Sequence, residues 1–195
     1  MKRGLLLLLP CILCIVSLVP ASFAQDHVQA GVYADYFHLS QTKTNFAGVG
    51  ARFGFQAYKS VMLEAEMSYD FNQVFTESFS SGGTIVAVQR TNTRVLHGLF
   101  GPKVELGHQS FHPFLTVKGG FNHFFLDNRP ATVGTAISSI ESLRSNDLTG
   151  VLYPGGGLEG HVGPVGLRLD VGDEIYFAGG AHHNLRVAFG PYIRF

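Results

Sequence analysis

Apolar residues recur at every second position in eight separate runs of this chain, and this alternation constrains the fold more than any other feature. The first run, 28–36, has Val28, Ala30, Val32, Ala34 and Tyr36 in phase. Successive side chains of a strand point to opposite faces, so a period of two predicts β-strands. The predicted strands span 28–36, 47–57, 61–72, 95–106, 113–122, 148–160, 165–172 and 184–195.

The first 24 residues have the layout of a secretory signal peptide. Two basic residues precede an apolar run over 5–19, and small residues stand before Gln25, where signal peptidase would cut. The alternative is an uncleaved N-terminal membrane anchor. We therefore expect a cleaved segment 1–24 and one mature domain, 25–195. Both cysteines lie in the first segment, so the mature chain is expected to have no disulfide.

Composition excludes several classes of protein. The chain is 46% hydrophobic and 14% charged, with 14 Lys+Arg against 14 Asp+Glu. A disordered protein would be more charged, and a nucleic-acid-binding protein would have a basic excess. Beyond residue 24 no uninterrupted apolar stretch reaches the ~20 residues of a membrane helix. If the mature chain enters a membrane, it must do so as strands.

The connections between the predicted strands are short and long in alternation. The short ones are 58–60, 107–110 and 161–164, and the others are 40–45, 73–92, 124–147 and 173–183. Short periplasmic turns and longer external loops are typical of outer-membrane barrels, and the strands have the ~9–11 residues that a tilted span needs. Hydrocarbon offers no partner to an unpaired edge, so the sheet must close. The fold class predicted is an all-β, eight-stranded, antiparallel up-and-down transmembrane β-barrel with both termini in the periplasm.

Aromatic and proline positions refine this barrel. Two aromatic girdles are expected, at the long-loop rim (Tyr36, Phe46, Phe71, Phe121) and at the short-turn rim (Phe53, Phe55, Phe111, Phe195). Proline cannot donate to a β-ladder. Pro102, Pro113, Pro154 and Pro191 are therefore expected near strand ends or at bulges.

The polar face of the strands combines small residues with charges of both signs. A soluble lipocalin-like carrier would instead present a surface rich in Lys and Glu and turn its apolar face inward. We expect the charges to point into a narrow lumen and to pair there, because eight strands leave room only for side chains. The predicted lumen network consists of Arg52, Glu64, Glu66, Asp70, Lys118, Arg168, Asp170, Arg186 and Arg194.

The C-terminal segment carries a family resemblance. Phe189, Pro191, Ile193 and the terminal Phe195 alternate, as in the last strand that the bacterial barrel-assembly machinery recognises. Together with the signal peptide and the eight strands, residues 25–195 resemble the OmpA-transmembrane-like or OmpX-like small outer-membrane barrels. The resemblance implies a bacterial outer-membrane location, with outer-membrane lipids and the assembly machinery as partners. It transfers fold better than function.

Catalysis is not expected. Some eight-stranded outer-membrane proteins modify lipid A, and two His-x-Ser matches exist, at His38–Ser40 and His108–Ser110. A nucleophile needs a base and an orienting group within reach, and the sequence indicates neither. Gly82-Gly83 and Gly155-Gly156-Gly157 lack the lysine and helix of a phosphate loop. No catalytic or cofactor-binding residue is predicted.

No metal site is predicted either. Nine histidines are present, with His38, His123, His182 and His183 expected at the external rim. Adjacent residues of a strand point to opposite faces, and no metal-binding spacing is present, so exposed loop histidines are the preferred interpretation.

The expected function is that of an outer-membrane barrel with a plugged lumen. It would act through its external loops, chiefly 73–92 and 124–147, in surface contact, adhesion or envelope integrity, with an external ligand or host surface as partner. The alternatives are a porin-like channel for small solutes and, in third place, a lipid A-modifying enzyme.

Overall fold

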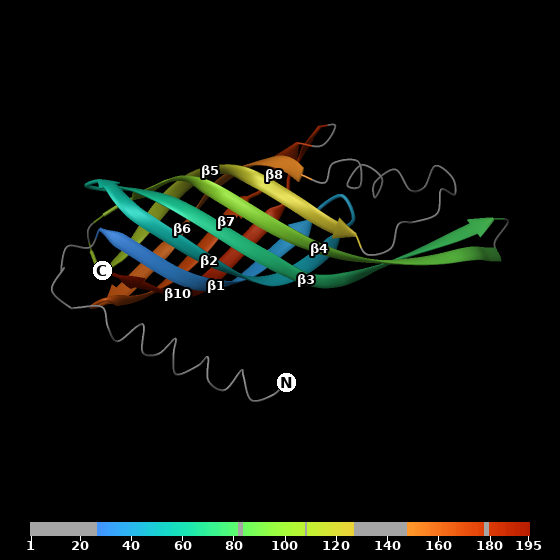
Figure 1. Ribbon diagram of the computed structural model, residues 1–195, viewed down its shortest axis with the longest axis horizontal. Coiled ribbons are helices and arrows are strands. Elements are labelled where there is room, and N and C mark those ends of the chain that lie inside the picture. Colours follow the sequence, from blue (N-terminus) through green and yellow to red (C-terminus); the bar gives the residue numbers. More distant parts are fainter. Residues whose placement is uncertain (1–26, 82–83, 108, 127–147, 178–179) are drawn as a thin grey trace, which may run out of the picture.

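Figure 1 shows the protein in a computed structural model that describes residues 27–81, 84–107, 109–126, 148–177 and 180–195, with the side chains of 72–92 and 126 left out. The expected signal peptide lies outside these ranges. No helix within them is long and apolar enough to cross a membrane.

Ten strands make one antiparallel sheet. They are β1 (Val28–Leu39), β2 (Thr44–Tyr58), β3 (Val61–Ser81), β4 (Thr84–Glu105), β5 (Phe111–Leu126), β6 (Leu148–Val162), β7 (Val165–Asp173), β8 (Ile175–Phe177), β9 (Ala181–His182) and β10 (Leu185–Arg194). All eight predicted strands are present. The predicted short turns are confirmed, because β2 and β3, β4 and β5, and β6 and β7 follow one another closely.

The sheet closes into a barrel. The strand order β5-β4-β3-β2-β1-β10-β7-β6 is completed by a further pairing between β5 and β6. The short strands β8 and β9 pair with each other, and β8 continues the ladder along β6 beyond β7. The barrel wall therefore has eight strands, which confirms the predicted fold class.

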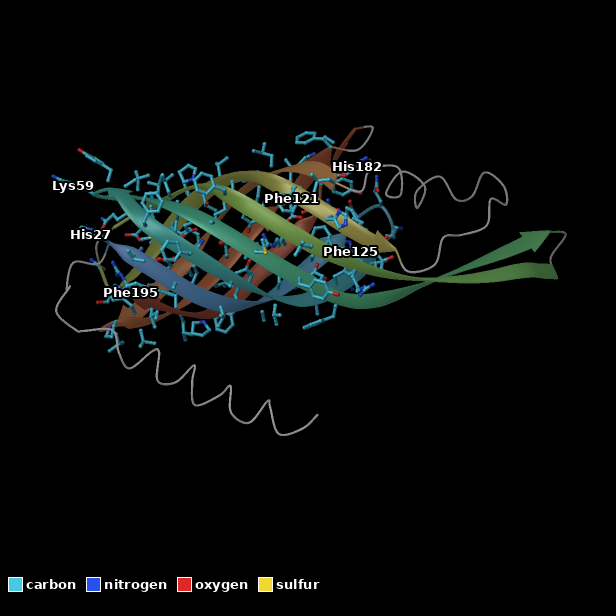
Figure 2. The ribbon with its side chains drawn as sticks, viewed as in Figure 1. His27, Lys59, Phe121, Phe125, His182 and Phe195 are labelled. Carbon is cyan, nitrogen blue, oxygen red and sulfur yellow. The ribbon has the colours of Figure 1, made fainter. Side chains whose placement is uncertain are left out.

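The two faces of the wall differ in polarity as the alternation predicts. Phe53 and Phe111 point outward with exposed fractions of 50% and 63%, whereas Lys118 and Glu159 have exposed fractions of 0%. Outward apolar residues occur on every long strand, and buried charges line the interior. In Figure 2 His27, Lys59 and Phe195 lie at one end of the barrel and His182 at the other. The first end has the short turns and both described termini.

The segment 73–92 departs from the prediction. It was expected to be a loop, but β3 and β4 continue through it as a paired ribbon from Gln73↔Thr93 to Ser81↔Thr84. A register shift after Asp70 marks where the ribbon leaves the wall. The segment is polar and lacks the apolar alternation of a wall strand, because a hairpin outside the wall needs no buried face. Figure 1 shows the ribbon projecting well beyond the barrel.

Aromatic girdles form at both rims, with one correction. Tyr36 and Phe71 are exposed at one rim, and the four short-turn aromatics are exposed at the other. Phe46 is instead fully buried. It shares strand parity with Arg52, so its side chain points into the lumen.

The prolines sit at gaps in the ladders. Pro102, Pro113 and Pro191 lie within three residues of a strand end, as expected, but Pro154 lies in the middle of β6. There β6 exchanges β7 for β8 as its partner, so the missing N–H of Pro154 falls where the ladder is already broken. The described strands accommodate all four prolines without opening the barrel.

Candidate functional site

The guanidinium of Arg168 binds several carboxylates inside the lumen. Arg168, on β7, donates to both carboxylate oxygens of Glu64 at 2.6 and 3.2 Å, to Asp170 at 2.7 Å and to Glu159 at 3.0 Å. Its guanidinium also lies 4.1 Å from the ring centre of Phe114. The planar fork of arginine suits such multiple recognition of carboxylates. Four strands of the wall are thereby linked through one side chain.

Lys118 and Arg52 extend this central layer. The Lys118 ammonium lies 2.6 Å from Glu66 and 2.9 Å from Glu64. Arg52 lies 3.5 Å from Glu66 and stacks 4.4 Å above the ring centre of Tyr33. Each carboxylate of the layer therefore faces at least one cation, as buried charges require.

A second set of buried charges lies nearer the long-loop end of the lumen. Arg186 donates to both oxygens of Asp35 through Nε and Nη2. His97 is buried, with Nδ1 2.8 Å from Glu174 and Nε2 3.0 Å from Asp70. Carboxylates accept hydrogen bonds, so both ring nitrogens donate, and an imidazole that donates twice is a cation. His97 is thus a third kind of lumen cation beside Lys and Arg.

An apolar layer caps these charges at the same end. Phe37, on β1, contacts the His97 ring edge-on at 4.8 Å and lies 6.2 Å from Phe46. Tyr176, from β8, lies 5.9 Å from Phe124. The full cluster comprises Phe37, Leu39, Phe46, Val95, Leu99, Phe124, Val151, Tyr153 and Tyr176. Ion pairs and, beyond them, packed rings therefore occupy the described part of the lumen.

At the short-turn end the network is centred on Lys103. Its ammonium lies 2.8 Å and 2.9 Å from the two oxygens of Glu159, 3.1 Å from Gln29 Oε1 and 3.2 Å from Glu105. His112 is buried beside these groups, 3.4 Å from Glu159.

The structure brings together eight of the nine residues of the predicted lumen network. All but Arg194 are buried and face one another across the lumen. Arg194 is half-buried at the short-turn rim, where it lies 3.2 Å from the His161 ring.

Seven further residues of the lumen are not part of the predicted network. They are Asp35, His97, Lys103, Glu105, His112, Glu159 and Glu174. Lys103 and Glu105 have the inward parity of their strand, and this signal was visible in the sequence. Glu159 was hidden by the glycine run before it, and Glu174 fell in the segment expected to be an external loop.

The His-x-Ser pair within the described residues, His38 and Ser40, is not assembled into a nucleophile and base. His38 hydrogen-bonds Asn45, and Ser40 hydrogen-bonds Asn184. His108 lies outside the described residues. The four rim histidines also keep separate partners: His182 contacts Gln41 and His183 contacts Asp173, while the His123 ring packs on Phe125.

The C-terminal residues form the outer face of the closing strand. Phe189, Ile193 and Phe195 are exposed, and the Phe195 backbone exchanges two 3.0 Å hydrogen bonds with Val28. The C-terminal end thereby joins the N-terminal strand of the barrel.

Solved structures with similar folds are small β-barrels. The N-terminal β-barrel domain of Pseudomonas aeruginosa OprF superposes with a TM-score of 0.52 at 12% identity, covering 88% of this chain and 98% of that domain. Neisserial surface protein A gives a TM-score of 0.51 at 12% identity, covering 87% of this chain and 96% of that one. This chain has the fold of the small outer-membrane β-barrels. No family model matches the sequence, and no curated protein matches it.

Proposed function

We propose that the protein is an integral outer-membrane barrel that acts as a surface-contact protein through its projecting ribbon, not as a conduit. The observation that carries this proposal is the difference in polarity between the outer and inner faces of the barrel wall. Apolar side chains cover its outside and charges fill its inside. Such a surface is unstable in water but matches a bilayer, where a closed barrel satisfies every backbone group.

The interior supports a role outside the lumen. The charges of the central layer have exposed fractions of 0–8%, whereas a water-filled pore would leave them exposed. In the described part of the lumen, this charged layer and the apolar cap take up the interior, which supports a plugged barrel and not a channel for solutes. We therefore assign the function of the protein to the segments that project beyond the barrel wall.

The ribbon 73–92 is the part best placed for contact. Pairing of β2 with β3 ends at Gly48↔Asp70, and pairing of β4 with β5 ends at Thr93↔Leu126. Among the described residues, each ribbon strand beyond these points pairs only with the other. Nine extended residues reach about 30 Å. No other described strand pairs with the two outer edges of the ribbon, and an extended partner segment can add to such edges.

Replacing 73–92 with an Asn-Gly turn tests this proposal. We expect the shortened protein to remain in the outer-membrane fraction and to keep the gel shift between unboiled and boiled samples that marks a closed barrel. Attachment of expressing bacteria to epithelial monolayers should fall to the level of cells without the protein. The matched control is Lys59→Ala, in the short turn at the opposite end, which should attach as the parent does.

Two outcomes would contradict the proposal. Unchanged attachment of cells carrying the shortened barrel would remove the ribbon from the function. Recovery of the parent protein from the soluble periplasm, without a gel shift, would remove the membrane location.

A further inference from the structure

Three ligand-bearing side chains converge at the short-turn end of the lumen. Glu105 ends β4, His112 lies near the start of β5, and Glu159 lies near the end of β6. His112 and Glu159 are direct cross-strand partners. One ligand atom from each of the three residues lies within 4.8 Å of the others. Three adjacent strands thus aim a nitrogen and two carboxylates at one point.

The orientation of His112 leaves its second nitrogen directed at the carboxylates. Nδ1 lies 2.9 Å from the carbonyl oxygen of Gln109, which can only accept, so Nδ1 carries the proton of this bond. Nε2 is buried, and no group among the described residues meets hydrogen-bond geometry with it. It lies 3.4 Å from Glu159 Oε2 and 4.0 Å from Glu105 Oε1. A backbone carbonyl that holds one imidazole nitrogen while the other faces acidic oxygens is the arrangement of metal-binding histidines.

The charges of the lumen leave room for a further cation. Among the described residues seven buried carboxylates face five buried Lys and Arg side chains. The carboxylates are Asp35, Glu64, Glu66, Asp70, Glu159, Asp170 and Glu174, and the cations are Arg52, Lys103, Lys118, Arg168 and Arg186. His97 offsets part of the difference at the other end. At the short-turn end Glu105 and Glu159 share Lys103, and Glu159 also accepts a hydrogen bond from Arg168 at 3.0 Å.

We propose that Glu105, His112 and Glu159 form a binding site for Zn²⁺ at the periplasmic end of the lumen. Zinc takes imidazole nitrogen and carboxylate oxygen, often as three protein ligands with water in the fourth position. Calcium and magnesium prefer ligand sets made of oxygen alone. Bond lengths of about 2.0–2.2 Å place the ligands of a tetrahedral zinc about 3.4 Å apart. The 3.4 Å from His112 Nε2 to Glu159 already matches this, whereas the 4.0 Å to Glu105 must contract, because the three ligand atoms are spread over as much as 4.8 Å.

The neighbours of the site set the terms on which an ion can bind. Lys103 donates to both oxygens of Glu159 and lies 3.2 Å from Glu105 Oε1, so a bound Zn²⁺ has to share these carboxylates with the ammonium or displace it. Glu105 keeps 12% of its side-chain surface exposed, so an ion can enter from the short-turn end. The site therefore takes up ions from the periplasm and not through the capped lumen.

Calorimetric titration of Zn²⁺ into the folded protein in detergent micelles tests the site. We expect one ion per chain, and substitution of Co²⁺ should produce the visible absorption of a tetrahedral site. His112→Asn keeps a donor towards Gln109 but lacks the second nitrogen, and Glu105→Gln removes one charge. Each should weaken binding at least about 10-fold, since even outer-shell changes at metal sites cost that much.

The matched control is His27→Asn. His27 lies at the same end of the barrel but outside the lumen, where it contacts Gln56, and its loss should leave Zn²⁺ affinity unchanged. Each variant is first required to show the folded band on unboiled gels. The site is overturned if the folded parent binds no Zn²⁺, if folded His112→Asn binds as tightly as the parent, or if Mg²⁺ and Ca²⁺ compete equally.

Discussion

At the scale of single residues, the interior depends on a few cations that each serve several carboxylates. Arg168 contacts Glu64, Glu159 and Asp170, and its side chain is almost wholly buried. Surface ion pairs contribute little to stability, but removing one partner of a buried set leaves uncompensated charge in a medium of low polarity. The position of Arg168 in the network, more than its charge alone, therefore decides the effect of losing it.

Arg168→Met is expected to destabilise the barrel by about 3–5 kcal/mol, the typical cost of breaking a buried ion pair. Three carboxylates would lose their shared donor while the volume stays similar. The measurement is the urea midpoint of unfolding in micelles, read from the loss of the folded band on unboiled gels. Lys59→Met removes a cation from the exposed turn before β3 and should leave the midpoint unchanged. Equal midpoints for the two variants would mean that the network does not hold the barrel together.

At the scale of strands, glycine on one strand makes room for an aromatic ring on the next. Gly166 on β7 is the direct partner of Tyr192 on β10, and a Cβ at Gly166 would lie 2.3 Å from that ring. Gly50 stands in the same relation to Tyr33. The rings lie flat over the glycines and fill the lumen, so these glycines serve packing and not turn formation.

Gly166→Ala should therefore destabilise the barrel by about 1–3 kcal/mol through overpacking. The matched control is Gly150→Ala on β6, where an added Cβ would meet nothing within 4 Å. Tyr192→Leu in the Gly166→Ala background should recover part of the loss, because the smaller side chain vacates the space. Denaturation midpoints of the four proteins measure this, and a missing difference between the two alanine variants would contradict the ring-on-glycine packing.

The sequence was informative about strands to the extent that their two faces differ. Period two predicts all eight wall strands and places Arg52 and Glu64 on the face that lines the lumen. The strands of the ribbon 73–92 are not predicted by this period, because a hairpin outside the wall has no buried face to impose alternation. The convergence of Glu105, His112 and Glu159 is not predicted either, because register across β4, β5 and β6 depends on turn geometry that residue spacing does not encode.

At the scale of the whole molecule, two layers of side chains follow one another inside the described part of the barrel. The central charges are paired across the lumen, and the apolar cluster around Phe37 and Phe46 stands between them and the long-loop end. A hydrated ion crossing this interior would have to separate buried ion pairs and then pass packed rings, and both steps are costly. An eight-stranded wall has an interior just wide enough for side chains, which favours the plugged lumen proposed above.

Planar-bilayer recordings of the purified folded protein are therefore expected to show no steady single-channel steps. Silence has meaning only if the barrel has inserted, so protease protection of reconstituted liposomes, with the folded band retained, must be measured on the same preparation. Steady steps that scale with the amount of folded protein would show that the charged layer and the apolar cap open together. The lumen, and not the ribbon, would then be the working part of the molecule.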